Sequence, residues 1–138
     1  TVEHYGWPYC YESGLPNPEY PDAQRCSGKV GPALEMQAHS APLGMVFYDH
    51  DQFPAEYRGD LFMAFHGSWN RSERTGYKVV RVEVEDGQPV SYDDFAAGWL
   101  TESGTVAGRP VAVEVGPEGS LYVSDDGAGR IWKIRWVG

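Results

Sequence analysis

Short runs of Val, Tyr, Phe and Trp alternate with Asp, Gly, Pro and Glu along the chain from Pro42 onward. Runs of this length and composition, bounded by turn-forming residues, are typical of β-strands. Helical periodicity is nearly absent, and 93–100 is the one stretch in which we consider a helix. The pattern therefore predicts an all-β fold with seven strands, at 43–48, 60–65, 77–85, 89–95, 111–115, 120–124 and 130–137.

An internal repeat organises these strands. Residues 42–48 parallel 110–116, residues 59–65 parallel 119–125, and residues 76–82 parallel 129–135. An inner strand, then a Gly-x-Leu-aromatic strand, then a strand of alternating basic and apolar residues is typical of a four-stranded propeller blade. We therefore expect one blade at 41–100 and an incomplete blade of three strands at 108–138.

Two blades cannot close a propeller, which needs at least four blades of about 40–50 residues each. Open blades would leave unpaired strand edges and apolar faces exposed to water. We therefore expect the chain to be part of a larger propeller. The missing blades would come from the same natural protein or from further copies of this chain, three of which would make six blades. The alternative is a self-contained β-sandwich of about seven strands.

Residues 1–40 form a loop-rich, proline-punctuated excursion without periodicity, and they contain both cysteines, Cys10 and Cys26. We expect a disulfide that pins this segment, which would stabilise it by about 3 kcal/mol and would imply an oxidising compartment. The alternative is two independent buried thiols. A zinc site of two Cys and a His lacks the CxxC or HxxxH spacing that would support it.

Charge narrows the classes of partner. The chain has 11 Lys and Arg against 20 Asp and Glu, a net charge of −9, which argues against a nucleic-acid-binding protein.

No apolar run approaches the roughly 18 residues that span a bilayer. The N-terminus shows neither a Met nor a basic-then-apolar leader, which we interpret as a processed chain or a fragment. A hydrophobic fraction of 41% is too high for a disordered chain.

The richest cluster of candidate ligand-binding residues follows the strand predicted at 60–65. It contains His66, Trp69, Asn70 and Arg71, a combination that suits an anionic, planar ligand. Arginine binds carboxylates, an indole stacks on a planar ring, and an imidazole or amide bonds carbonyl oxygens. The alternative is a solvated surface loop whose Trp packs locally.

Two further residues precede the inner strands of the two blades. Arg109 lies between Gly108 and Pro110, where it could point toward a central channel and bind an anion; the alternative is an ordinary surface arginine. His39 occupies the equivalent position before the other inner strand. His50, flanked by Asp49 and Asp51, is either a metal ligand or part of a solvated turn.

The familiar catalytic signatures are missing from the sequence, including Gly-x-Ser-x-Gly, the phosphate-binding Gly-x-x-x-x-Gly-Lys, Gly-x-Gly-x-x-Gly and His-Glu-x-x-His. Residues 125–127 resemble a fragment of a calcium loop but lack its remaining ligand spacing, so we expect a turn between two strands.

Seven segments together resemble the sorbosone dehydrogenase branch of the soluble glucose/sorbosone dehydrogenase family, and they occur in order along essentially the whole chain. They are HYGWPYCY at 4–11, AHSAPLG at 38–44, YRGDLF at 57–62, FHGSWNR at 65–71, GYKVVRV at 76–82, GRP at 108–110 and SLYVSDD at 120–126. The resemblance is to the C-terminal third or so of that family.

This resemblance implies a six-bladed β-propeller that binds pyrroloquinoline quinone (PQQ), usually with calcium, and oxidises sugars in the periplasm or outside the cell. It implies a cofactor wall that includes Arg109 and the loop of His66, Trp69, Asn70 and Arg71, where the glucose dehydrogenase branch often has a Lys. His39 would line the same cavity.

In the family the catalytic His and the calcium-contacting backbone lie upstream of these segments. The resemblance therefore implies no catalytic residue here, and we expect the 138 residues alone to be inactive. In the family, hydride passes from the sugar C1 to the quinone with the His as general base. The alternative function is a non-catalytic propeller module that binds a partner through its loops.

Overall fold

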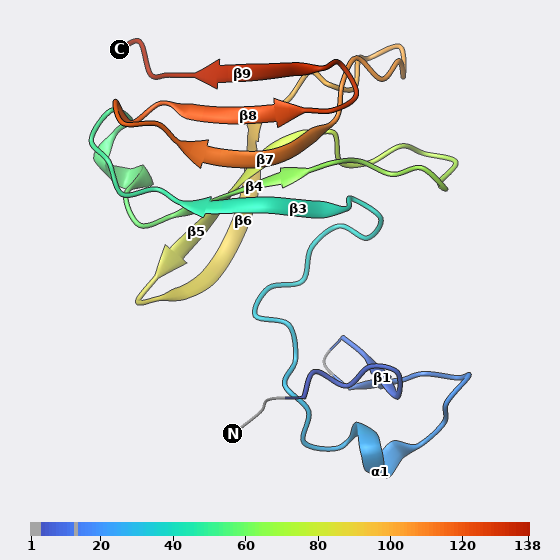
Figure 1. Ribbon diagram of the computed structural model, residues 1–138. Coiled ribbons are helices and arrows are strands. Elements are labelled where there is room, and N and C mark those ends of the chain that lie inside the picture. Colours follow the sequence, from blue (N-terminus) through green and yellow to red (C-terminus); the bar gives the residue numbers. More distant parts are fainter. Residues whose placement is uncertain (1–3, 13) are drawn as a thin grey trace. The chain divides into compact units, whose positions relative to one another are not determined.

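The seven predicted strands are present and form two antiparallel sheets (Figure 1). The structure is a computed structural model, and it describes residues 4–12 and 14–138. The first sheet has the strand order β3-β4-β5-β6 and the second has the order β7-β8-β9. The strands are β3 (Pro42–Phe47), β4 (Leu61–Phe65), β5 (Lys78–Glu85), β6 (Gln88–Ala96), β7 (Pro110–Val115), β8 (Leu121–Asp125) and β9 (Arg130–Ile134).

One strand ends earlier than predicted. The sequence predicts a strand over 130–137, but β9 ends at Ile134. The main chain of Trp136 instead bonds the side chain of Gln52, with its N–H 3.0 Å from Oε1 and its carbonyl oxygen 2.8 Å from Nε2. The amide of Gln52 therefore takes the place of a neighbouring strand, and the chain leaves the sheet.

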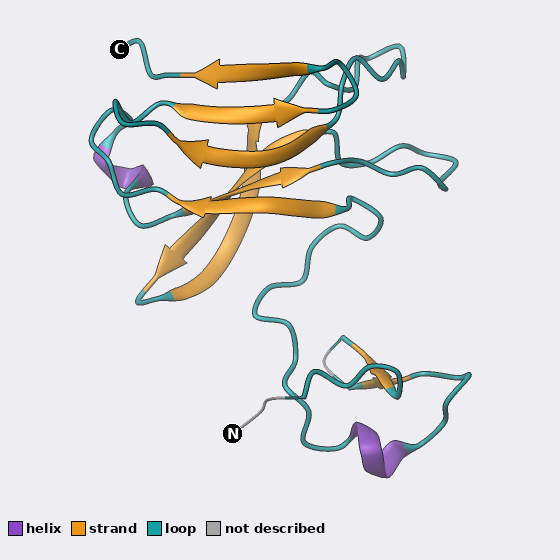
Figure 2. Cartoon of the chain, in the orientation of Figure 1, coloured by secondary structure: helices purple, strands orange, loops and turns teal. Residues whose placement is uncertain are grey.

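In the part of the chain that the structure describes, helical structure is confined to two short segments, shown in purple in Figure 2. They are α1 (Ala23–Cys26) and the 3-10 helix η1 (Ala55–Tyr57). Residues 93–96 belong to β6, so the stretch at 93–100 forms no helix. Within residues 4–12 and 14–138 there is no helix of the length and hydrophobicity needed to cross a membrane.

The core lies between the two sheets, where β7 packs against β3 and β4 (Figure 1). Tyr48 connects them, since its hydroxyl donates to the carbonyl of Gly119 at 2.9 Å and accepts from the N–H of Phe53 at 3.0 Å. Both polar contacts satisfy a fully buried hydroxyl, as burial requires. The other buried core residues are Phe53, Phe62, Ala64, Tyr77, Val79, Trp99, Val113, Leu121 and Val123.

The inner strands β3 and β7 approach so closely that position 44 requires glycine. A Cβ on Gly44 would lie 2.6 Å from the Cα of Ala112 and 2.9 Å from the carbonyl oxygen of Val111. Both neighbours are main-chain atoms, so the strands themselves would have to separate.

We therefore expect Gly44→Val to destabilise the protein by about 1–3 kcal/mol, the range typical of overpacking. Urea denaturation followed by tryptophan fluorescence measures this change. A loss below about 0.5 kcal/mol, the level of an ordinary surface substitution, would contradict the close approach of the two strands.

Contacts within the chain divide it into two compact units, Thr1–Met36 and Gln37–Gly138, and both large sheets belong to the second. In the first unit, β1 (Cys10–Tyr11) pairs with β2 (Leu15–Pro16). The predicted Cys10–Cys26 disulfide is confirmed, with a Cα–Cα distance of 5.4 Å. The alternative of two independent thiols is therefore wrong.

The buried side chain of Asn17 also holds the first unit together. Its Nδ2 donates to the carbonyl of Pro8 at 2.7 Å, and its Oδ1 accepts from the N–H of Glu19 at 2.9 Å. Asp22 caps α1 by accepting from the N–H of Arg25. Local polar contacts and the disulfide thus order a segment that has little regular secondary structure.

Candidate functional site

The loops that carry the candidate residues gather at one end of the two sheets. Strand register shows this directly, because Phe65 at the end of β4 lies opposite both Pro42 and Lys78. In the second sheet, Pro110 at the start of β7 lies opposite Asp125 at the end of β8. We call this end the rim, and define it as residues 38–41, 66–77, 108–109 and 125–129.

Arg109 joins the two sheets at the rim. Its Nη1 lies 3.2 Å from the carbonyl oxygen of Gly67 and 3.5 Å from that of His66. Its Nη2 lies 3.3 Å from the hydroxyl of Tyr77, and its guanidinium carbon lies 4.9 Å from the centre of the Tyr77 ring. Two motifs that are 43 residues apart in sequence therefore form one half-buried cluster.

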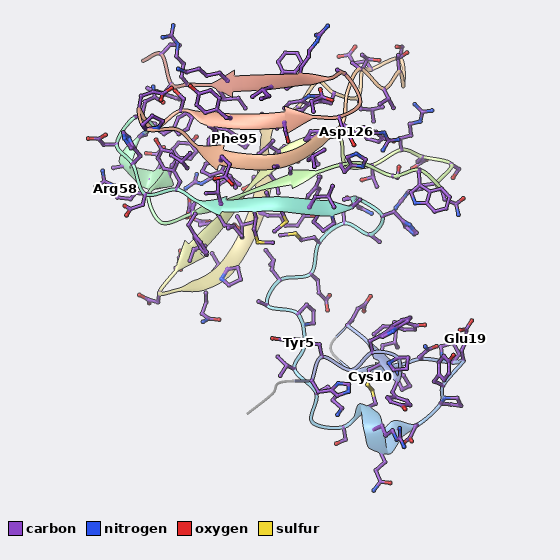
Figure 3. All side chains as sticks on the ribbon, viewed as in Figure 1. Tyr5, Cys10, Glu19, Arg58, Phe95 and Asp126 are labelled. Carbon is purple, nitrogen blue, oxygen red and sulfur yellow. A yellow bond between two sulfur atoms is a disulfide. The ribbon has the colours of Figure 1, made fainter. Side chains whose placement is uncertain are left out.

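His66 also reaches across to the second sheet. Its Nε2 lies 3.0 Å from Oδ1 of Asp126, which Figure 3 labels at the rim. The side chain of His66 is 24% exposed and that of Asp126 is 62% exposed. The imidazole is thus held from one side while a quarter of its surface stays open to a ligand.

Asp125, which directly precedes Asp126, is a buried carboxylate that accepts hydrogen bonds from four N–H groups. Oδ1 accepts from the main chain of Arg109 at 2.7 Å and of Ala128 at 2.9 Å. Oδ2 accepts from the indoles of Trp99 at 3.0 Å and Trp132 at 2.9 Å. Burial alone would raise the pKa of Asp125, but the hydrogen bonds from Arg109, Trp132, Ala128 and Trp99 outweigh it and lower the pKa below its ordinary value.

This lowered pKa predicts how stability depends on pH. A carboxyl group whose pKa is lower in the folded state stabilises the fold above its unfolded-state pKa and loses that contribution as pH falls through the folded-state value. We therefore expect stability to fall as the pH drops below about 3.8, the ordinary pKa of the group. Urea denaturation at several pH values should show a smaller decline over this range in Asp125→Asn, and an unchanged decline would contradict this assignment.

Segment 38–41 is hydrogen-bonded to the start of the His66 loop, and its main chain is in a constrained conformation. His39 and Ala41 have φ of 65° and 52°, in the left-handed region that few non-glycine residues occupy. The carbonyl of Ser40 accepts from the N–H of Gly67 at 2.9 Å, and that of Ala41 accepts from the N–H of His66 at 3.0 Å. The hydroxyl of Ser40 is buried without a hydrogen-bond partner among the residues described, and the side chain of His39 is exposed.

The remaining candidates lie on the loop between β4 and β5. The base of the loop is closed by the N–H of Ser68, which donates to the carbonyl of Thr75 at 2.9 Å. Arg71 donates to the carbonyl of Ala38 at 3.3 Å. Trp69 is 88% exposed and Asn70 is exposed as well. The structure thus brings His66 and Arg109 together and sets Arg71 beside segment 38–41, while Trp69 and Asn70 project from the loop.

Sequence analysis missed three rim residues that these contacts reveal, namely Tyr77, Asp125 and Asp126. The internal repeat carries a signal for one of them, because the register that aligns 59–65 with 119–125 also aligns His66 with Asp126. For Asp125, no sequence signal indicates its indole partner Trp99, which is 26 residues away.

The donor chemistry of the rim fits an anionic, planar cofactor such as PQQ. The three hydrogen bonds of Arg109 leave its Nε and one N–H of Nη2 without a partner in the part of the chain that the structure describes. A guanidinium with such free donors binds carboxylates well. Among the described residues there is no group of three or more His, Cys, Asp or Glu that could hold a metal ion, and this includes the surroundings of His50.

Comparisons with known proteins show which family the chain matches. The family model described as TrAA12-like matches residues 1–137. An uncharacterized protein of Borreliella burgdorferi is 35% identical over 137 residues, covering 97% of this chain and 36% of that protein. A pyrroloquinoline quinone-dependent pyranose dehydrogenase of Coprinopsis cinerea is 30% identical over 138 residues, covering 85% of this chain and 18% of that protein.

Solved structures give the same picture. The holo form of the PQQ domain of the Coprinopsis cinerea pyranose dehydrogenase has a TM-score of 0.72 at 25% identity, covering 99% of this chain and 41% of that one. The calcium structure of the Trichoderma reesei family AA12 enzyme has a TM-score of 0.74 at 24% identity, covering 94% of this chain and 37% of that one.

The chain therefore spans well under half the length of these relatives, as expected for a C-terminal portion. The predicted fold class is confirmed, and the two large sheets are two blades of a six-bladed β-propeller, the second with three strands. With a family model matched from residue 1 to residue 137, the chain belongs to the TrAA12-like family.

Proposed function

We propose that this chain supplies part of the quinone-binding wall of a PQQ-dependent sugar dehydrogenase, of the aldose or sorbosone type. The observation that carries the proposal is the contact of Arg109 with the carbonyls of His66 and Gly67, which joins a cation and an imidazole at one end of two blades. The names of the pyranose dehydrogenase relative and of its PQQ domain support the choice of cofactor.

Each rim residue has a role in this proposal. Arg109 donates its free N–H groups to a carboxylate of the cofactor, and His66 presents its partly exposed ring beside it. The wall is completed by further donors and one stacking surface, which come from the same loop as His66 (Trp69, Asn70 and Arg71) and from segment 38–41 (His39). When bound, PQQ accepts the hydride equivalent that the sugar gives up on oxidation.

The chain itself contributes no general base in this proposal. None of the rim residues is assigned a catalytic role, and calcium is bound by parts of the dehydrogenase other than the residues described here. The 138 residues alone are therefore inactive, and the remainder of the propeller supplies the base and the rest of the sugar site.

The remaining blades, or further copies of this chain, are the proposed partners. The outward side of β3 exposes three apolar residues in alternation, Leu43, Met45 and Phe47, with 47%, 56% and 62% of their surface accessible. Alternate apolar residues on one face are expected where a second sheet packs. A disulfide in the first unit favours a periplasmic or secreted location.

The test uses the full-length protein that carries this sequence. PQQ is titrated into the apoprotein in calcium buffer, binding is followed by tryptophan fluorescence, and oxidation of aldoses is followed with a dye as electron acceptor. We expect saturable PQQ binding and quinone-dependent sugar oxidation, and no oxidation by the 138-residue chain. A full-length protein that binds no PQQ would overturn the proposal and favour a non-catalytic binding module.

A further inference from the structure

We propose that Asp125 and Asp126 are positioning residues of this wall: Asp125 fixes the main chain of Arg109, and Asp126 orients the ring of His66. This inference rests on the proposed function. Two adjacent carboxylates beside a site for an anionic cofactor would weaken its binding by charge repulsion. Their presence is explained by the two residues that they position, Arg109 and His66.

Asp125 acts on Arg109 through the main chain. The N–H of Arg109 lies 2.7 Å from Oδ1, at the start of β7, so the carboxylate determines where the side chain of Arg109 leaves the strand. The carboxylate of Asp125 is tightly packed against the main chain, because a Cβ on Gly108 would lie 2.1 Å from its Oδ2. Asp125 is 3% exposed, so the cofactor does not touch it in this arrangement.

The two indoles hold Asp125 in turn. Trp99 follows β6 of the first sheet and Trp132 lies in β9 of the second, and both donate to Oδ2. Their rings meet edge to face with centroids 6.0 Å apart. The position of Arg109 is therefore determined jointly by both blades, which is the rigidity that a bidentate carboxylate contact requires.

Asp126 acts on His66 through the side chain. An ionised carboxylate can only accept a hydrogen bond, so in the 3.0 Å contact Nε2 of His66 is the donor, which fixes both the tautomer of the neutral ring and the ring plane. The N–H of Asp126 lies 3.3 Å from the carbonyl of Arg109, so the two positioned residues share one support. His66 and Arg109 thereby keep a constant relative placement.

The experiment measures PQQ affinity of the full-length protein at a temperature well below its unfolding transition. Asp126→Ala and Asp126→Asn remove the same charge from an exposed residue, but the Asn amide oxygen can still accept from His66. The matched control is Glu118→Gln, which removes one charge from the turn after β7, at the opposite end of that strand from the rim. Like Asp126, Glu118 is partly exposed and paired with a base, in this case Lys133.

Positioning and charge repulsion predict opposite signs. If Asp126 orients His66, Asp126→Ala weakens PQQ binding about 10-fold, the effect typical of losing a residue that orients a ligand-binding side chain. Asp126→Asn weakens PQQ binding less, because its amide oxygen still accepts from His66. In a His66→Gln background neither substitution has a further effect. Tighter binding in both variants, or equal loss with and without His66, would overturn the role of Asp126.

Asp125→Asn tests whether Asp125 positions Arg109. We expect it to weaken PQQ binding about 10-fold when Arg109 is present and to have no effect on affinity in an Arg109→Gln background, while it lowers stability in both. An affinity loss that persists without Arg109 would show a merely structural role. If the unmodified protein binds no PQQ, the proposed function itself fails and the inference fails with it. If it binds PQQ but Asp126→Ala, Asp126→Asn and Asp125→Asn all leave the PQQ affinity unchanged, only the inference fails.

Discussion

Replacing Phe62 with alanine should destabilise the fold by about 4 kcal/mol, since burial and packing of a phenylalanine are both lost. The ring of Phe62 is fully buried, and it lies 4.7 Å from that of Phe95, labelled in Figure 3, and 5.8 Å from that of Tyr48, measured between centroids. Removing it opens a cavity between the two blades that these aromatic neighbours cannot fill. Urea denaturation of the full-length protein measures the change.

The matched control for Phe62→Ala is Trp69→Ala, which truncates a large aromatic residue that is 88% exposed. Because Trp69 buries almost no surface, its loss should change stability by less than about 0.5 kcal/mol in the absence of cofactor. Equal effects of the two substitutions would contradict the position of the core between the sheets.

Replacing Arg109 with glutamine should weaken PQQ binding by about 100-fold. A hydrogen bond to a charged group contributes about 1.5–3 kcal/mol, and each 1.4 kcal/mol is a factor of ten in affinity. The substitution also removes the contacts with His66, Gly67 and Tyr77 that hold the His66 loop in place. Fluorescence titration of the full-length apoprotein with PQQ gives the dissociation constant.

Arg81→Gln is the control for Arg109→Gln. Arg81 also lies over a tyrosine ring, 4.3 Å from the centroid of Tyr57, and pairs with Asp60 just before β4, away from the rim. Its loss should affect stability but leave PQQ affinity within about twofold. A comparable loss of affinity in both variants would mean that Arg109 acts through the fold alone.

The strands were predictable because each carries its own local signal. Apolar runs bounded by Gly, Asp and Pro place the ends of six strands to within one residue, and the repeat assigns them to two blades. The bound that failed is the end of β9, which depends on Gln52, a residue far away in sequence. Contacts of that kind have no signature in a local pattern.

The same limit applies to the site. The residue types of His66 and Arg109, together with their places beside strands, indicated a common site, and the structure brings the two together. Asp125 carried only the signal of a turn, and Asp126 added only its alignment with His66 in the repeat, because their side chains also bond residues far away in the chain. Supporting residues of a site are recognised by their partners, and these appear only in the folded chain.

The most direct measurement is a crystal structure of the full-length protein with PQQ bound. We predict that a guanidinium nitrogen of Arg109 lies about 2.7–2.9 Å from a carboxylate oxygen of the cofactor, with the ring of His66 beside it. A cofactor bound elsewhere, with Arg109 still bonded only to the His66 loop and more than about 6 Å from any cofactor oxygen, would contradict the account.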